Sequence, residues 1–149
     1  MNKGYLLSII ALFSFFNTQA QDVYWPESSE ELNTGANSSY FISTVNYDDT
    51  QIGFGYRIGA FYINDEGDLE CGGYANCSLN AFQMVVWGDD ATTLDKSGFT
   101  EGEEITWLAL KIYPDSTTFT ATIEAVESAS TYSTNGLNFI TTFSISSSF

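Results

Sequence analysis

The chain has 149 residues, 44% of them hydrophobic and 16% aromatic, and nineteen acidic side chains against four basic ones give it a formal net charge of −15. Such a negative surface repels phosphate backbones and anionic lipids, which argues against nucleic acid or a membrane surface as partner. The chain contains no histidine, and its only cysteines are Cys71 and Cys77. A zinc or copper site built from His and Cys and a nucleophile activated by His are therefore excluded.

The first predicted element is a cleaved secretory signal over residues 1–20. One lysine precedes an apolar run at Tyr5–Phe16, which is short for a membrane span, and small residues precede the expected cut after Ala20. This pattern predicts export to the medium, the cell surface or the periplasm, with no transmembrane span left after cleavage. Residues 21–149 are expected to form one domain, because no linker or repeat divides them.

Short runs rich in β-branched and aromatic residues follow, each bounded by Gly, Asn, Asp or Ser. They predict strands at Tyr40–Asn46, Gly55–Ile63, Leu69–Ala75, Phe82–Trp87, Ile105–Tyr113, Thr117–Val126 and Asn138–Ser146. No window after Gln21 repeats apolar residues at helical spacing. The predicted fold class is all-β, an antiparallel two-sheet β-sandwich of about seven to eight strands, of jelly-roll or immunoglobulin-like type.

Two junctions along the chain predict hairpins. Residues 64–68 contain Gly67, which tolerates the positive φ that a hairpin loop needs. Residues 114–116 begin with Pro114, which cannot donate to a sheet, and continue with turn-favouring Asp and Ser. Between these hairpins, Cys71 and Cys77 are expected to form one local disulfide in an oxidising compartment.

The last run leaves a second architecture open. Phe139, Phe143, Ile145 and Phe149 fall on one parity, as on the wall of a small outer-membrane β-barrel. However, the runs FQMVVW and WLALKI are apolar on both faces, whereas a barrel wall alternates apolar and polar positions. The two-sheet sandwich fits these runs better, and the barrel is kept as the alternative.

Carboxylates are the remaining candidates for catalysis, as the acid and base of a glycoside hydrolase. Their abundance does not identify a positioned pair, so no catalytic residue is assigned and a non-catalytic protein is predicted. Acidic loops also suit Ca²⁺, which prefers oxygen ligands, although neither acidic cluster fits a helix-flanked calcium loop. The alternative is a pair of solvated turns in which Asp caps backbone N–H groups. The candidate metal ligands are Asp65, Asp68, Asp89, Asp90 and Asp95.

The three tryptophans are candidates for packing against sugar rings. Trp87 and Trp107 lie in apolar strand runs and are expected in the core. Trp25, in VYWPES near the mature end, is the candidate exposed ring and the one predicted ligand-binding residue.

The connection VVWGDDATTLDKSGFTEGEEITW is long for a small β domain and is interpreted as a loop that packs on itself. Asp89 and Asp90 can bond the backbone of the turn, Gly98 permits a tight reversal, and Phe99 can return to the core as an anchor. Lys96 lies among Asp90, Asp95 and Glu101 in the sequence, and we expect it to neutralise that charge.

The same stretch resembles a recurrent β-rich module of secreted and cell-surface proteins from bacteria with type IX secretion. The matching residues are Trp87, Gly88, Asp89, Asp90, Thr93, Lys96, Gly98, Phe99, Gly102 and Glu103, with IGAFYI and Cys71-Gly72-Gly73 before them. Leu94 stands where the module often has Pro, and Ser97 where it often has Asp, a substitution that would remove a metal ligand. The resemblance covers about Ile58 to Trp107 and implies adhesion, ligand binding or a structural role.

Together these observations predict an exported, non-catalytic module. It is expected to recognise a protein or polysaccharide at the cell surface, or to serve as a subunit of an extracellular assembly.

Overall fold

The computed structural model describes residues 23–114, 116–125 and 129–146. The predicted signal peptide at 1–20 lies outside the described residues. Each of the predicted runs forms a strand. The structure adds a two-residue strand and one 3₁₀ turn, which are both too short to leave a sequence pattern. The elements are η1 (Ser29–Leu32), β1 (Asn37–Tyr47), β2 (Thr50–Gln51), β3 (Tyr56–Ile63), β4 (Leu69–Asn76), β5 (Phe82–Trp87), β6 (Thr106–Lys111), β7 (Thr117–Ala125) and β8 (Leu137–Ile145).

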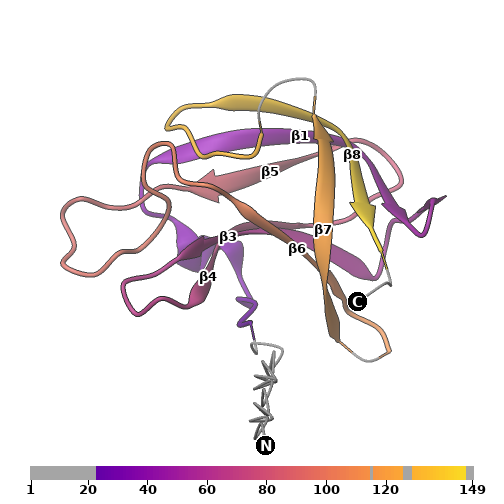
Figure 1. The fold of residues 1–149 in the computed structure, drawn as a ribbon, viewed down its shortest axis with the longest axis horizontal. Coiled ribbons are helices and arrows are strands. Elements are labelled where there is room, and N and C mark those ends of the chain that lie inside the picture. The colour runs from indigo at the N-terminus through magenta and orange to yellow at the C-terminus, as the bar shows by residue number, and fades with distance from the viewer. Residues whose placement is uncertain (1–22, 115, 126–128, 147–149) are drawn as a thin grey trace, which may run out of the picture.

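The eight strands form two packed layers, which confirms the predicted β-sandwich. In Figure 1, β1, β5 and β8 lie in the upper layer and β3, β4 and β6 in the lower one, with β7 running between them. Residues 117–120 of β7 pair with β6 and residues 121–125 pair with β8, so this strand carries the hydrogen bonding from one sheet to the other. The path of paired strands, β2-β1-β8-β7-β6-β3-β4, does not close on itself, because β5 pairs with β1 and not with β4.

One strand pair differs from the predicted antiparallel pattern. The two predicted hairpins, β3–β4 and β6–β7, are antiparallel, and Gly67 has the positive φ of 89° that the first turn requires. In contrast, β1 and β8 pair in parallel along their whole shared length. A hairpin forces its strands to run in opposite directions, whereas strands from distant parts of the chain are free of that constraint.

The core fills the space between the sheets with side chains from the inward positions of both. Trp107 is 5% exposed, and its indole makes edge contacts with the rings of Tyr40 and Phe143, at centroid distances of 5.4 and 5.1 Å. Each fully buried side chain of this size contributes about 1.5–3 kcal/mol relative to an exposed one. This burial confirms the core position that was expected for Trp107.

The parity that was expected for β8 is wrong. Phe139 is 43% exposed on the outer face, whereas Phe143 and Ile145 are buried in the core. Asn138 and Ile140 are also buried, so the inward positions change from even to odd numbers between residues 140 and 143. An irregularity in the strand therefore switches its faces. Phe149 lies outside the described residues.

A second, smaller cluster lies on the outer face of the β4–β3–β6 sheet. Phe61 and Leu108 project there, and the segment that precedes β1 crosses over them with Val23, Trp25 and Leu32. The N-terminal segment approaches this sheet from below in Figure 1. The chain thus covers the outer apolar face of one of its two sheets.

The predicted disulfide between Cys71 and Cys77 is wrong, because both cysteines are free and buried. Cys71 belongs to the outer cluster and Cys77 to the core between the sheets, so their side chains lie on opposite faces of the sheet. Six residues of extended strand rise on the order of 20 Å. A disulfide instead requires Cα atoms roughly 4.4–6.8 Å apart.

The described parts of the chain contain no helix that is long and apolar enough to cross a membrane.

Candidate functional site

The connection from β5 to β6 folds back on the end of β5. A parallel bridge joins Gly88 to Phe99, and the Asp89 N–H donates to the Phe99 carbonyl at 2.8 Å. The Asp89 carboxylate accepts hydrogen bonds from the N–H and the hydroxyl of Ser97, at 2.7 and 3.3 Å. Ser97, which stands where the resembling modules often have Asp, therefore acts as a hydrogen-bond donor inside the loop.

Asp90 is bonded within its own turn. Its carboxylate accepts the hydroxyl of Thr92 at 2.7 Å and the N–H of Thr92 at 2.9 Å. These two bonds, the hydroxyl bond first, lower the pKa of Asp90 from its ordinary value, because they favour the charged form. The carboxylate thus caps a turn in the way that the solvated-turn alternative describes.

Phe99 fixes the loop to the core. Its ring is 1% exposed and lies between the rings of Tyr62 and Tyr132, with centroid distances of 5.3 and 5.5 Å. A Cβ atom added to Gly98 would collide with the backbone of Gly88, which cannot move without moving the end of β5. At this position the close approach of two backbone segments requires glycine.

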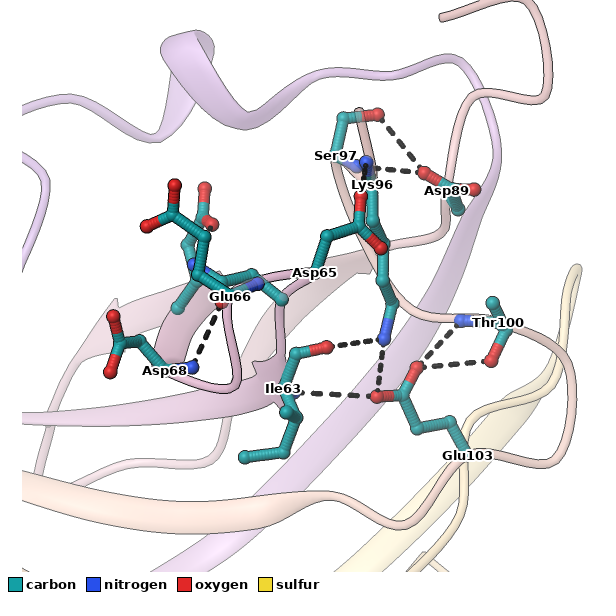
Figure 2. A network of polar contacts seen from close by, with 11 residues as sticks. Ile63, Asp65, Glu66, Asp68, Asp89, Lys96, Ser97, Thr100 and Glu103 are labelled. Atoms are coloured by element: carbon teal, nitrogen blue, oxygen red, sulfur yellow. Dashed lines mark hydrogen bonds and ion pairs between the residues drawn. The ribbon is translucent and has the colours of Figure 1, made fainter. Parts of the chain in front are cut away.

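Lys96 and Glu103 form the charged centre of the loop (Figure 2). The Lys96 ammonium donates to Glu103 Oε1 at 2.7 Å and to the Ile63 carbonyl at 2.5 Å, and it lies 5.1 Å from the centroid of the Tyr62 ring. The second oxygen of Glu103 accepts from the N–H and the hydroxyl of Thr100, at 2.9 and 3.1 Å. These contacts join the loop to the end of β3.

The pKa of Glu103 reflects two opposing effects. Partial burial alone would raise it, but the hydrogen bonds from Lys96 and Thr100 and the charge of Lys96 together outweigh burial and hold the pKa below its ordinary value. The carboxylate is therefore charged at neutral pH, where it keeps its ion pair with Lys96.

The expected partners of Lys96 differ from those that the structure shows. Lys96 was expected to neutralise Asp90, Asp95 and Glu101, but its ammonium pairs with Glu103. The carboxylate of Glu101 instead accepts from the Thr134 N–H and the Ser133 hydroxyl, at 2.8 and 2.9 Å, which lowers its pKa. Proximity in sequence misled here because the loop reverses between Asp90 and Lys96.

The predicted metal ligands do not converge. Asp65 and Asp95 line one hollow of about 310 Å³, together with Lys96, whose N–H donates to Asp65 at 2.9 Å. Asp89 and Asp90 are engaged by Ser97 and Thr92 inside the loop, and Asp68 lies in the turn between β3 and β4. Within the described ranges, no three acidic or cysteine side chains gather in a way that could hold a metal ion.

A larger hollow lies elsewhere, between η1, β4 and β5. It is an open groove of about 620 Å³. Its lining is Ser29, Glu30, Asn33, Tyr74, Gln83, Met84, Val85 and Trp87. Gln83, Val85 and Trp87 alternate along β5 with the buried Met84 and Val86, so the strand presents its outward side chains to the groove.

Trp87 is half-buried in this groove rather than enclosed in the core, which corrects the expectation from its apolar run. Among the described residues, no other ring packs on its indole and none bonds its Nε1. Trp25, the predicted exposed ring, is also half-buried, but its ring meets that of Phe61 at 4.9 Å and its Nε1 donates to Thr118 at 3.3 Å. A role for Trp25 in ligand binding stays a prediction. Of the two indole rings, only that of Trp87 has neither a ring contact nor an Nε1 hydrogen bond among the described residues.

Tyr74, the second aromatic residue of the groove lining, is held in place by a hydrogen bond and a cation–π contact. The Tyr74 hydroxyl donates to the Glu27 carbonyl at 3.1 Å, and the guanidinium of Arg57 lies 4.8 Å from the centre of the Tyr74 ring. Arg57 in turn donates to the side chain of Asn76 at 2.9 Å. The groove therefore has a fixed aromatic side chain, Tyr74, on β4 and a second aromatic side chain, Trp87, on β5.

The alternating pattern of β5 carried a signal for this groove, but both parities of FQMVVW contain large apolar residues, which hid the outward face.

Comparisons with models of protein families, with curated proteins and with solved structures find no match. The fold and the site themselves define the class, a two-layer β-sandwich with an open groove at the edge where its sheets meet.

Proposed function

We propose that this protein is an exported, non-catalytic module that binds a polysaccharide chain in the groove between η1, β4 and β5. The observation that carries the proposal is Trp87, whose indole lines an open groove and has no ring partner among the described residues. A half-buried aromatic ring in such a setting offers a surface on which the C–H face of a sugar can pack.

The rest of the lining suits the same ligand. Asn33 and Gln83 carry amides that both donate and accept hydrogen bonds, Ser29 adds a hydroxyl, and Glu30 adds an acceptor. Sugar hydroxyls require this mixture. The volume of about 620 Å³ falls in the usual range for small-molecule and cofactor sites, which is roughly 300–1,000 Å³.

The composition of the groove favours binding over hydrolysis. A glycosidase usually needs two carboxylates on either side of the scissile bond. Glu30 is the one acidic side chain in the lining of the groove, so a second carboxylate is missing from that wall. The acidic hollow around Asp65 and Asp95 has carboxylates but no aromatic lining on which a sugar could pack.

The export pattern at residues 1–20 and the resemblance of about Ile58 to Trp107 to modules of surface proteins support a location outside the cell. Polysaccharides are abundant ligands in that setting, and the long braced loop fits a structural part of the module better than a binding part.

The test is binding to a panel of soluble and insoluble glycans, with three variants compared. We expect Trp87→Ala to weaken binding about tenfold, which corresponds to roughly 1.4 kcal/mol, while Leu94→Ala, a change at a fully exposed loop residue, leaves it unchanged. Trp25→Phe tests the other tryptophan while keeping a ring on Phe61. A wild-type protein that binds no glycan, or a Trp87→Ala variant with unchanged affinity, would overturn the proposal.

A further inference from the structure

The outer face of β5, β1 and β8 continues directly from the groove. The register of these strands places their outward side chains in rows that cross all three. One row contains Gln83, Phe41 and Phe139, and the next contains Val85, Ser39 and Leu137. We refer to these six side chains as the outer platform.

The outer platform carries no charge, although the chain has nineteen acidic residues. It also keeps apolar side chains in contact with solvent, since Phe41, Phe139 and Leu137 are 37%, 43% and 56% exposed. Soluble proteins usually interrupt such a surface with charged residues, so an uncharged apolar patch indicates an interaction site.

The side chains of the platform contact one another across the strands. The rings of Phe41 and Phe139 stack with centroids 5.4 Å apart and an interplanar angle of 20°. The Gln83 amide donates to the Ser39 hydroxyl at 3.1 Å, which holds it against the strand. Neighbouring strands lie about 4.8 Å apart, so the distance from β5 to β8 is on the order of 10 Å.

The platform and the groove are continuous at Gln83. A second hollow of about 220 Å³ lies over β5 and β1, where Phe41, Ser43 and Phe82 line it with Gln83. Gln83 also lines the groove beside Trp87. A ligand that leaves the groove at Gln83 therefore reaches Phe41, the nearer of the two stacked phenylalanines, without crossing a charged side chain of the lining.

Resting on the proposed function, we infer that the outer platform extends the binding site and that its occupant is an extended, uncharged polysaccharide. Aromatic rings pack against the apolar faces of successive sugars, and the amide and hydroxyl between them serve the sugar hydroxyls. No basic side chain lines the groove or belongs to the platform, and the net charge of −15 repels carboxylated or sulfated chains. Trp87 determines whether a glycan binds. Phe41 and Phe139 determine how many sugar units of the glycan contribute to its affinity.

The test is titration calorimetry with neutral oligosaccharides from disaccharide to hexasaccharide, in the cello-, xylo-, manno- and chito- series. Polygalacturonate and alginate serve as acidic probes. We expect affinity to rise with chain length in one neutral series. Phe139→Ala is expected to lower the affinity for the hexasaccharide at least fivefold and to leave that for the shortest bound member unchanged. Trp87→Ala is expected to weaken every member of the series.

The possible outcomes separate the two proposals. If neither the neutral sugars nor the acidic polymers bind, the proposed function fails. If only the acidic polymers bind, the extended site alone fails. If sugars bind in the groove but Phe139→Ala matches the wild type at every length, or acidic polymers bind equally well, only the extended site fails. A dimer seen by light scattering that Phe139→Ala abolishes, without any change in sugar affinity, would assign the platform to a second copy of the chain and also overturn the inference. The exposure of Phe139 predicts that its variant folds, which a thermal melt checks.

Discussion

The two outer faces of this sandwich differ in whether their apolar side chains are covered by another segment of the chain. On the β4–β3–β6 face, Phe61 and Leu108 are covered by the segment that carries Val23 and Trp25, and Phe61 is 0% exposed. On the β5–β1–β8 face, Phe139 keeps 43% exposure. Apolar residues are therefore structural on one face, whereas on the other they are available to a partner.

The sequence alone points to the acidic residues as candidate binding groups, rather than to the apolar residues of the exposed face. In the structure, the carboxylates of Asp89, Asp90, Glu101 and Glu103 are each bonded to neighbouring N–H or hydroxyl groups. They stabilise loops at the edge of the fold. The indole of Trp87, which has no such partner, is uncharged and lies on a strand.

The largest effect is expected on the covered face. Phe61→Ala should reduce the free energy of unfolding by about 3–5 kcal/mol, because it empties a fully buried site beneath Trp25. Urea denaturation measures this loss, and Phe139→Ala is the matched control, for which we expect a loss below about 1 kcal/mol. Similar losses from the two variants would mean that the two faces do not differ as described.

A smaller effect should follow from filling the space under Trp25. A Cβ atom at Gly59 would lie 2.8 Å from atoms of both the Trp25 and the Phe61 rings. Gly59→Ala should therefore push the N-terminal segment outward and cost about 1–3 kcal/mol. Stronger quenching of tryptophan fluorescence by acrylamide reports the displacement, with Ser43→Ala on the other face as the control. Unchanged quenching together with unchanged stability would show that the segment is not held by this contact.

A change in the loop should leave both faces intact. Glu103→Gln removes the partner of Lys96 and should reduce the free energy of unfolding by about 1–2 kcal/mol at neutral pH. Because the pKa of Glu103 is lower in the folded protein than its ordinary value of 4.5, its contribution is present above that pH and is lost as the pH falls through the folded value. Denaturation from pH 7 to pH 3 should show the two proteins converging. A constant difference would contradict this assignment, and glycan binding should be the same in both.

The strands could be read from the sequence with boundaries close to those observed, because each run of β-branched and aromatic residues ends at a true turn. What failed depended on local irregularity. The parity switch in β8 moved Phe143 inward and left Phe139 outside. The register shift between Ala60 and Phe61 sits opposite β4, where Cys71 projects outward although Cys77 points into the core. Single-residue irregularities of this kind leave no signal in a residue pattern.

The candidate site likewise has one part that the sequence predicted, the loop, and one part that it did not, the groove. The braced loop could be recognised because glycine, aspartate and an aromatic anchor mark a tight turn in any context. The groove could not, because it forms where η1, β4 and β5 meet, and no stretch of sequence contains all three. The roles of Trp25 and Trp87 depended on which ring the N-terminal segment covers, and that is a tertiary property.

The smallest expected effect concerns the two cysteines, and it sharpens the comparison of the faces. Burial raises the pKa of both thiols to about 12, so very little thiolate is present at pH 8 and alkylation requires opening of the fold. Reducing agent should leave the melting temperature unchanged, because no disulfide is there to break. Cys71 should react before Cys77 with iodoacetamide, since only the N-terminal segment must lift to expose it, and Gly59→Ala should widen that gap. Equal rates at both sites, measured by mass spectrometry of the peptides, would mean that the covered face opens only when the whole sandwich unfolds.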